Sequence, residues 1–398
     1  MTALVVGYGR SGKAAEALLK AQGAETVVLA DDTRDRIGEG AFDFAVVSPG
    51  IALTHPWVVE AKRRGIPLKS ELQLGCEELK RQGWKLLAVT GSKGKSSVVK
   101  VVADAIDLAG GYAVACGNYG IPVSEVASSN TQTLKHSNNS PWAVVEVSSF
   151  MMETTELASD TFEAAAILNL QEDHLDRHGS VEVYHGLKRK LLTFAKKGIE
   201  PVKRSGDRFP SLWARSYFDN EILAGNAAIA VGLMRVAGLN DAAIAKAFRE
   251  FAPLPHRMNL VAEIDGVRFI DDSKATSLAA LIAGAKMASS GNQTVLLIAG
   301  GLPKGDDPKT ALSTLTERVK KVYLIGQSAE AFFAAWNGAA DCEVCGTMER
   351  AVERAKREAE KGETVLLSPG TASFDQFKSF GERGEVFARL VKEKEKRQ

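Results

Sequence analysis

Short runs of β-branched and apolar residues recur along the chain and alternate with segments whose apolar residues follow a helical period. The helical segments include AAEALLKAQG and VVKVVADAIDLAGG. Continuous apolar strands alternating with helices are typical of parallel sheets covered by helices on both faces. We therefore predict an α/β fold with binding sites at the carboxyl ends of its strands. The predicted strands are residues 4–7, 26–30, 44–50, 86–91, 143–149, 165–170, 267–272, 294–301, 321–326 and 364–370.

The strand and helix pattern restarts along the chain, which indicates several domains. A second unit begins at LLAVTGSKGKSS, and a third begins near PLPHRMNLV, after an alanine-rich helical stretch. We predict three domains, comprising residues 1–86, 87–252 and 253–398. Residues 200–221 show no clear period and are predicted to form a loop.

Composition and charge are those of an ordinary globular protein. The chain has 398 residues, of which 45% are apolar, and its 50 Lys and Arg nearly balance its 49 Asp and Glu. Overall charge therefore gives no reason to expect a nucleic-acid or membrane partner, and any phosphate binding must come from local sites. No run of 18 apolar residues occurs, and the amino terminus lacks the features of a signal peptide, so we expect a cytoplasmic protein.

Cys342 and Cys345 form a lone C-x-x-C pair. No second pair accompanies them, and the other two cysteines lie far away in sequence. Chance spacing is therefore favoured over a metal or redox site.

A first glycine-rich loop, Gly7–Gly12, has the sequence GYGRSG between a predicted strand and a predicted helix. Asp31 and Asp32 end the next strand, as in dinucleotide-binding folds. Such a loop lets the backbone approach a pyrophosphate at a helix amino terminus. A tight turn without a ligand is the alternative, and the pattern does not distinguish NAD from another nucleotide diphosphate. A second loop, SPGI at 48–51, is expected to face the same crevice.

A sharper signal follows the strand LLAVT. Here the loop has the sequence Gly91-Ser92-Lys93-Gly94-Lys95-Ser96-Ser97, and a helix follows it. Backbone N–H groups of such a loop hold phosphates, the lysine neutralises their charge, and the serine after it can ligate Mg²⁺. The loop is a tighter variant of the common motif, because Val89 stands where that motif has glycine. It predicts ATP binding and disfavours a dehydrogenase.

Carboxylate and imidazole side chains follow two later strands. Glu146 lies in AVVEVSSF, whereas Asp173 and His174 lie in ILNLQEDHLD. Each is more often structural when taken alone. Beside a phosphate loop, however, they predict a site that holds Mg²⁺ against triphosphate oxygens.

Four motifs, TGSKGKSS, EVSSFMMET, LNLQEDHLDRH and LPHRM, together resemble the ATP-dependent Mur ligases of peptidoglycan synthesis. That family also includes folylpolyglutamate synthase. SPGIALTHP at 48–56, IDDSKATS at 270–277 and the segment 366–391 are similar to the members that use D-glutamate. The resemblance implies a monomer with a Rossmann-like first domain for UDP-N-acetylmuramoyl-L-alanine, a central P-loop domain for ATP and two Mg²⁺, and a Rossmann-like third domain for D-glutamate.

The resemblance also implies roles for individual residues. Lys188 matches a lysine that the family carbamylates to ligate the second Mg²⁺, and Lys190 is its nearby competitor. Asn226 matches an adenine contact, although a helix cap is the plainer interpretation. Phosphate and Mg²⁺ would be held by Lys95, Ser96, Glu146 and His174, and the nucleotide would also contact Arg257 and Asp272. The UDP substrate would be bound by Gly9, Ser11, Asp32, Arg34, Gly50 and Asn118. D-glutamate would be bound by Lys274, Thr276, Lys304, Ser373 and Phe380.

The implied reaction has two steps. The substrate carboxylate attacks the γ-phosphate of ATP, and the D-glutamate amine then attacks the resulting acyl phosphate. The third domain would close over the ligands to complete the site. Catalysis of this kind depends on positioning and on neutralising two anions that repel each other.

The chain departs from the family pattern in three places. Residues 191–225 are shorter than usual, which predicts a trimmed central domain, and changes at Leu302-Pro303 and Gly370-Thr371 remove no donor. Two alternatives stay open. A NAD-dependent oxidoreductase would leave the second loop unexplained, and a non-catalytic binding protein with a degenerate ligase fold is disfavoured because the matched donors are present.

Overall fold

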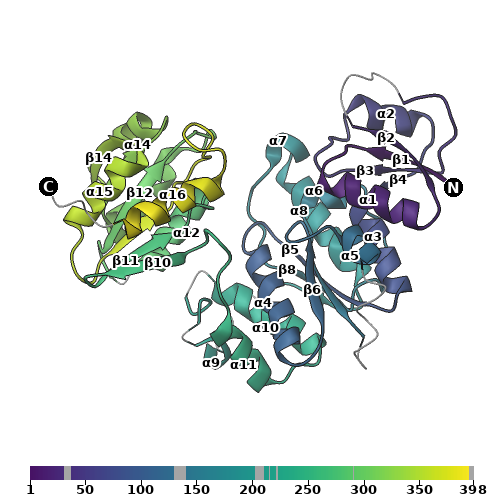
Figure 1. Ribbon diagram of the computed structural model, residues 1–398, viewed down its shortest axis with the longest axis horizontal. Helices are drawn as coiled ribbons and strands as arrows, with labels where there is room; N and C mark the ends of the chain where they lie inside the picture. Colours follow the sequence, from purple (N-terminus) through teal and green to yellow (C-terminus); the bar gives the residue numbers. More distant parts are fainter. Residues whose placement is uncertain are drawn as a thin grey trace. The chain divides into compact units, whose positions relative to one another are not determined.

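The computed structural model of the protein describes residues 1–30, 37–129, 140–201, 210–214, 216–220, 223–289 and 291–393 (Figure 1). The chain forms two compact units, Met1–Phe251 and Ala252–Gln398. The first unit contains two sheets and the second contains one. Among these described residues, every pairing between strands is parallel except one at a sheet edge, so the predicted α/β class is confirmed.

The amino-terminal sheet has the strand order β2-β1-β3-β4. Helix α1 follows β1 directly, and its Ala15, Leu18 and Leu19 are buried. The strands are β1 (Thr2–Val6), β2 (Glu25–Leu29), β3 (Phe44–Val47) and β4 (Leu68–Ser70), and the helices are α1 (Arg10–Ala21), α2 (Pro56–Arg63) and α3 (Glu71–Arg81).

The central sheet has the strand order β6-β7-β5-β8-β9, with β5 in the middle. Its strands are β5 (Lys85–Thr90), β6 (Ala113–Gly117), β7 (Trp142–Glu146), β8 (Ala164–Ile167) and β9 (Gly198–Ile199). Its helices are α4 (Lys95–Leu108), α5 (Val123–Ser129), α6 (Ser149–Met152), α7 (Leu175–His178), α8 (Val181–Lys190), α9 (Pro210–Trp213), α10 (Ala224–Val236) and α11 (Asp241–Glu250), with a 3₁₀ turn, η2, at Leu191–Phe194.

One hydrophobic cluster joins these two sheets. It includes Val5 of the first sheet and Leu86 of the second sheet. It also includes Leu72, which lies in α3, and Trp84, which follows α3. A buried polar contact lies at the same junction, where the Glu71 carboxylate accepts from the Ser124 backbone N–H at 2.6 Å. Burial of this shared apolar surface holds the two sheets together as one unit.

The carboxyl-terminal sheet has the order β10-β11-β15-β12-β13-β14, and only β10 runs antiparallel to its neighbour. A separate hydrophobic cluster covers each face. Its elements are β10 (Asn259–Ile264), β11 (Val267–Asp271), α12 (Leu278–Ala288), β12 (Val295–Gly300), η3 (Pro308–Ala311), α13 (Leu312–Arg318), β13 (Val319–Ile325), α14 (Ala329–Trp336), β14 (Asp341–Gly346), α15 (Met348–Glu358), β15 (Thr364–Leu367) and α16 (Phe380–Lys392).

Every strand predicted from the sequence is present, and β4, β6, β9, β10 and β14 were missed. The prediction of a loop over 200–221 is wrong at α9, whose four residues are too few to show a period.

Cys342 and Cys345 lie on β14, and their side chains join clusters on opposite faces of the sheet. The two side chains therefore do not face one another.

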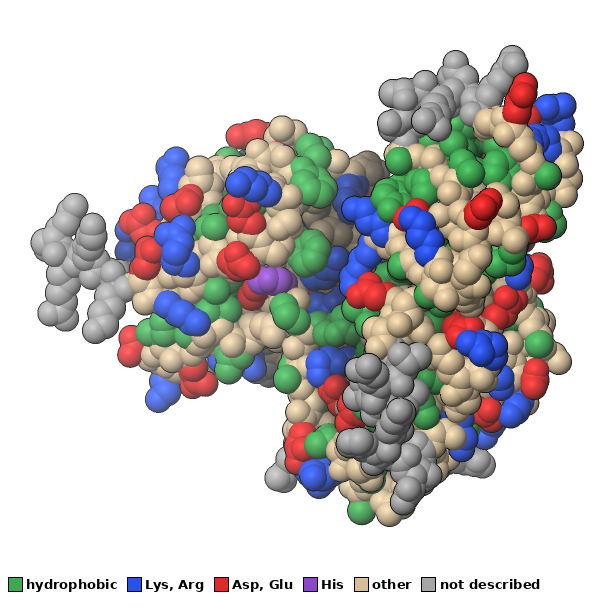
Figure 2. Space-filling view, turned by 45° about the vertical axis from the view of Figure 1, so that its right-hand side comes forward, with side chains coloured by type: hydrophobic (Ala, Val, Ile, Leu, Met, Phe, Trp, Pro, Cys, Tyr) green, Lys and Arg blue, Asp and Glu red, His purple; other side chains and the backbone are tan. Residues whose placement is uncertain are grey.

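In the part of the chain that the structure describes, no helix combines the length and the apolar character needed to cross a membrane. The face in Figure 2 shows basic and acidic side chains interspersed over the surface of each unit. This mixture accords with the formal net charge of +1.

Candidate active site

The second glycine-rich loop, Gly91–Ser97, connects the central strand β5 to α4. Gly94 caps the helix in the left-handed region, with φ 85°. A Cβ atom there would lie 2.1 Å from Nδ2 of Asn226, so any other residue would strain the backbone and displace the Asn226 side chain. The first N–H groups of α4 lack partners within the helix, and together with the helix dipole they favour an anion at this point.

Two lysines converge on this loop. Nζ of Lys95 donates to the carbonyl oxygens of Gly91, at 2.8 Å, and Ser92, at 3.2 Å. Nζ of Lys188 donates to the same Gly91 oxygen at 3.1 Å, and Lys188 is only 1% exposed. Burial, and secondly the charge of Lys95, lower the pKa of Lys188 to about 7. A substantial fraction of this amine is therefore neutral and nucleophilic near neutral pH.

The segment after β8 is bonded to the phosphate loop. The Asn169 side chain accepts from the Lys93 N–H and donates to the Lys93 carbonyl, both at 2.9 Å. The Ser92 hydroxyl donates to the Gln171 carbonyl at 3.0 Å and lies 3.2 Å from the Tyr184 hydroxyl. Neither Asn169 nor Tyr184 was predicted from the sequence. Asn169 has a usable signal, since it is a polar residue two positions after the buried strand β8.

Glu146 ends β7, the strand beside β5, and is 2% exposed. Its Oε1 accepts from Nδ2 of Asn118 at 2.6 Å, which brings two predicted site residues together. Its Oε2 is buried and has no hydrogen-bond partner among the described residues. A buried carboxylate oxygen without a donor is costly unless a cation or a bound molecule satisfies it. The oxygen thus fits a Mg²⁺ ligand.

His174 precedes the one-turn helix α7 and has φ 54°, a strained conformation for a residue other than glycine. Its ring packs against Phe150 with 4.8 Å between centroids, and its side chain is 46% exposed. Nearby, Asp173 lies 3.5 Å from Nζ of Lys93. No three His, Cys, Asp or Glu side chains within the described ranges could hold a metal alone. The donor set instead suits Mg²⁺, which binds one or two protein groups together with phosphates and water.

The amino-terminal glycine loop is hydrogen-bonded to the loop at 48–51, which was predicted to face the same crevice. Ser48 Oγ donates to the Gly7 carbonyl at 2.7 Å, and a Cβ atom on Gly12 would lie 2.0 Å from that oxygen. Gly9 caps α1, where Ser11 lies in the first turn, and Gly50 is exposed. Asp32 and Arg34, also predicted to bind substrate, lie outside the described residues.

In the carboxyl-terminal unit, Asp272 follows β11 and is 8% exposed. It accepts from the Ser368 hydroxyl at 2.9 Å, and burial raises its pKa to about 7. Arg257 lies in the turn before β10, where its N–H donates to Asn259 at 2.9 Å. The adjacent Asp271 is 2.7 Å from Nδ1 of His256. These residues gather at the end of β11.

The residues predicted to bind D-glutamate lie on loops of the same unit, except Phe380, which is the first residue of α16. Nζ of Lys274 is 3.8 Å from the ring centroid of Phe380, which places these two residues together. Ser373 is buried, Thr276 is partly buried, and Lys304 is exposed in the loop after β12.

Arg383, which sequence analysis missed, organises this region. It is fully buried, and its guanidinium donates to the carbonyls of Ser273, Thr371 and Ala372 and to the Ser273 hydroxyl. Burial lowers its pKa to about 10. The sequence signal was its place on the buried face of α16, one turn before Phe387.

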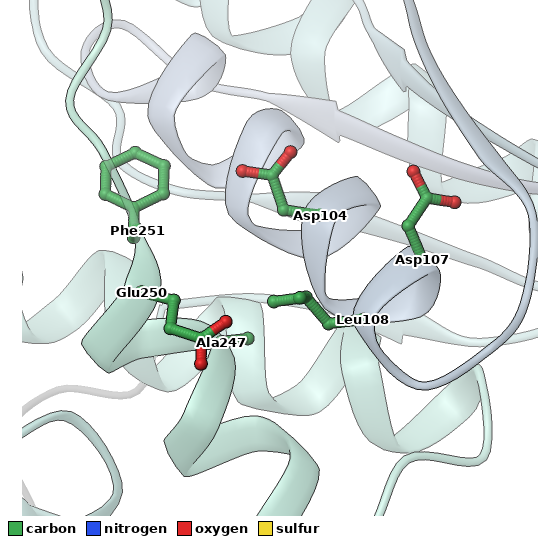
Figure 3. A pocket seen from close by; sticks show the side chains of 6 residues that line it. All are labelled: Asp104, Asp107, Leu108, Ala247, Glu250 and Phe251. Atoms are coloured by element: carbon green, nitrogen blue, oxygen red, sulfur yellow. The ribbon is translucent and has the colours of Figure 1, made fainter.

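A pocket of about 390 Å³ lies elsewhere, between the carboxyl ends of α4 and α11 (Figure 3). Its lining includes the carboxylates of Asp104, Asp107 and Glu250. These charges would repel a triphosphate, and the phosphate loop lies at the other end of α4. The pocket is therefore not the nucleotide site.

Two family models and full-length relatives match this chain. Residues 89–206 match the model of the Mur ligase middle domain, and residues 256–370 match that of the Mur ligase glutamate ligase domain. The chain is 32% identical over 454 residues to the UDP-N-acetylmuramoylalanine--D-glutamate ligase of Acidobacterium capsulatum, covering 98% of this chain and 95% of the relative. The enzyme of the same name from Chromobacterium violaceum is 34% identical over 449 residues, covering 97% and 96%.

Solved structures agree with this fold. MurF from Acinetobacter baumannii superposes with a TM-score of 0.60 at 14% identity, covering 95% of this chain and 98% of the other. The UDP-N-acetylmuramate-alanine ligase MurC from Thermotoga maritima gives a TM-score of 0.56 at 17% identity, covering 98% of both chains. At these identities the likeness concerns the fold.

Proposed function

Because the chain belongs to the Mur ligase family, we propose that it is an ATP-dependent ligase that joins D-glutamate to UDP-N-acetylmuramoyl-L-alanine in peptidoglycan synthesis. The names of the full-length relatives support this substrate pair. The observation that supports this chemistry is that two lysines bond to the phosphate loop and that a buried carboxylate, Glu146, has one oxygen without a hydrogen-bond partner among the described residues. That set suits a triphosphate and a divalent cation rather than a nicotinamide.

In the first step, an oxygen of the substrate carboxylate attacks the γ-phosphorus of ATP, and the bond to ADP breaks. Lys95 and the first N–H groups of α4 neutralise charge on the phosphates during this transfer. Mg²⁺, when bound, supplies further neutralisation of the two anions. Ser96, Glu146 and His174 would hold it, with Lys188 as a carbamate at a second site.

In the second step, the amine of D-glutamate attacks the acyl carbon, and phosphate leaves through a tetrahedral intermediate. Lys274, Thr276, Lys304, Ser373 and Phe380 would bind the amino acid. Lysine and hydroxyl donors suit a dicarboxylate, because each carboxylate gains charge-assisted hydrogen bonds. Arg257 and Asp272 would contact the nucleotide from this part of the chain.

Lys188 is suited to carbamylation. Its neutral amine would attack the carbon of CO₂, form an N–C bond and release one proton to solvent. The product is an anion that replaces a cation beside Lys95. Both the burial of Lys188 and its lowered pKa favour this chemistry.

The remaining assignments complete the proposal. Gly9, Ser11, Gly50 and Asn118, with Asp32 and Arg34, would hold the UDP substrate. Asn226, which already contacts the phosphate loop, would bind adenine. The working domains would be residues 1–86, 87–252 and 253–398.

The test is a coupled assay of ADP release across a panel of amino acids. We expect release only when ATP, Mg²⁺, UDP-N-acetylmuramoyl-L-alanine and D-glutamate are all present. Equal release with L-glutamate or meso-diaminopimelate would move the assignment to another ligase of the family. Tight NADH binding without UDP binding would favour an oxidoreductase, and nucleotide binding without turnover would favour a binding protein.

A further inference from the structure

Arg177 joins the two halves of the first unit. It belongs to α7 of the central part, yet its guanidinium donates to the Ile51 carbonyl at 2.7 Å and lies 3.5 Å from the Pro49 carbonyl. Both carbonyls belong to the 48–51 loop, whose Ser48 is bonded to the first glycine loop. Arg177 is thus a direct polar link between the two halves.

The same guanidinium is also held by Glu153, which directly follows α6. Nε and Nη2 of Arg177 contact the two carboxylate oxygens at 3.0 and 2.6 Å, a bidentate pair. The side chains of Arg177 and Glu153 are 17% and 8% exposed, so the pair is screened little by solvent. Glu153 also lies 3.3 Å from Nδ1 of the buried His178.

These contacts fix an element too short to hold its own shape. Helix α7 has only four residues, and a single turn does not persist in water without tertiary contacts. Two of those residues, Arg177 and His178, are tied to Glu153. His174 stands at the start of the same turn in a strained conformation, so its position depends on these ties.

We propose that Arg177 is a positioning residue that couples occupancy of the uridine-nucleotide loop at 48–51 to the placement of His174 at the phosphate site. A ligand that orders the 48–51 loop orders the Ile51 carbonyl, and through Arg177 it orders α7. This inference rests on the proposed function, because it takes the 48–51 loop as the UDP-substrate site. Arg177 touches no reacting atom in this scheme.

The test measures coupling between two ligands by calorimetry on the full-length protein. The affinity for UDP-N-acetylmuramoyl-L-alanine is determined with and without AMP-PNP and Mg²⁺. For the wild type we expect each ligand to tighten the other by about fivefold or more. In Arg177→Ala the factor should fall below about twofold, while the affinity for AMP-PNP alone stays within about twofold of wild type. Turnover should fall by up to about 10²-fold, because His174 is displaced.

Two further variants control for structure. Arg63→Ala removes an exposed arginine that also makes a bidentate pair, with Glu60, but links no loop; it should behave as wild type. Arg177→Lys retains the charge and the fold but cannot hold both partners, so we expect a reduced coupling factor.

The outcomes separate the two claims. A wild type that binds both ligands without coupling, or an Arg177→Ala or Arg177→Lys protein that keeps full coupling, overturns the inference alone. A wild type that binds no UDP-N-acetylmuramoyl-L-alanine overturns the proposed function and the inference with it.

Discussion

Lys95 and Lys188 donate to one acceptor, the carbonyl oxygen of Gly91, at 2.8 and 3.1 Å. Such an arrangement brings two positive groups to one point of the phosphate loop. Burial, together with the charge of Lys95, lowers the pKa of Lys188 to about 7. The proposed carbamate would relieve this arrangement, because it would turn Lys188 into an anion beside Lys95.

Replacing Lys188 by alanine should reduce turnover by about 10²-fold or more, because a group that holds charge in the transition state is lost. A short carboxylic acid added to the Lys188→Ala protein should restore part of the rate by occupying the place of the carbamate. Lys190→Ala is the control, since Lys190 pairs with Glu156 near the surface. Full activity of Lys188→Ala without rescue would exclude the carbamate.

Replacing Lys95 by alanine should lower kcat by about 10²–10³-fold, the usual effect of removing one preorganised charge-stabilising group. The circular dichroism spectrum and the thermal midpoint should stay close to wild type, since the two carbonyls to which Lys95 donates lie on the loop itself. Lys100→Ala, on the same helix and paired with Asp104, should leave kcat unchanged. Retained turnover in Lys95→Ala would contradict the role of the loop.

Gly94 and Gly110 offer a matched pair, with φ of 85° and 84°. Alanine at either position meets the same backbone strain, of about 1 kcal/mol. Only at Gly94 would the new Cβ collide with Asn226, since nothing lies within 4 Å of the position at Gly110. Gly94→Ala should therefore weaken AMP-PNP binding at least about tenfold, and Gly110→Ala should not. Equal affinities in titration calorimetry would count against this account of the loop.

Glu71 makes stability depend on pH. Burial raises its pKa from near 4.5 to about 7, so the folded state holds a proton between those values that the unfolded state has lost. The contribution of Glu71 is therefore fully present below pH 4.5 and is lost as the pH rises through 7, at a cost of roughly 3 kcal/mol.

The neutral variant Glu71→Gln should avoid this loss. Urea unfolding at pH 5 and pH 8 should show Glu71→Gln gaining stability relative to wild type as the pH rises. Glu77→Gln, on the same helix with a side chain 46% exposed, should show no such gain. A relative stability of Glu71→Gln that does not change with pH would contradict the prediction.

Phe380 should matter for the amino acid and not for the nucleotide. The centroid of its ring lies 3.8 Å from Nζ of Lys274, so Phe380→Ala removes the ring that helps position this ammonium and should raise the KM for D-glutamate by about tenfold. The KM for ATP should change little. Phe374→Ala is the control, because Phe374 is 70% exposed on the same segment. An unchanged KM for D-glutamate in Phe380→Ala would remove Phe380 from that site.

Sequence reasoning found the elements with strong apolar runs. β5 and β12 are buried along most of their length, and such strands read as continuous apolar stretches. β10 and β14 were missed because they are edge strands whose side chains are largely exposed or partly exposed, so the apolar run is broken. α9 was missed because four residues show no period.

The residues of the candidate site also fall into those that the sequence predicts and those that it does not. The phosphate loop and Glu146 were predictable, because their positions at strand ends are written in consecutive residues. Arg177 was not, since its partners Glu153 and Ile51 lie 24 and 126 residues away in the chain. Asn169 and Arg383 had local signals in the sequence, but their bonds to Lys93 and Ser273 span 76 and 110 residues. Long-range hydrogen bonds leave no period in the sequence. Only the three-dimensional arrangement shows that Arg177 of α7 bonds both to the 48–51 loop and to Glu153.

The cluster that joins the first two sheets limits how this protein can be recombined. Residues 1–86 could not be exchanged as a cassette for those of a distant relative without also exchanging α5 and β6, because Leu72, Trp84, Val126 and Cys116 pack in one core. The two hydrophobic clusters of Ala252–Gln398 are built from residues of that unit, so a junction at Phe251 and Ala252 divides neither of them. Chimaeras that swap the amino-acid specificity should therefore be joined there.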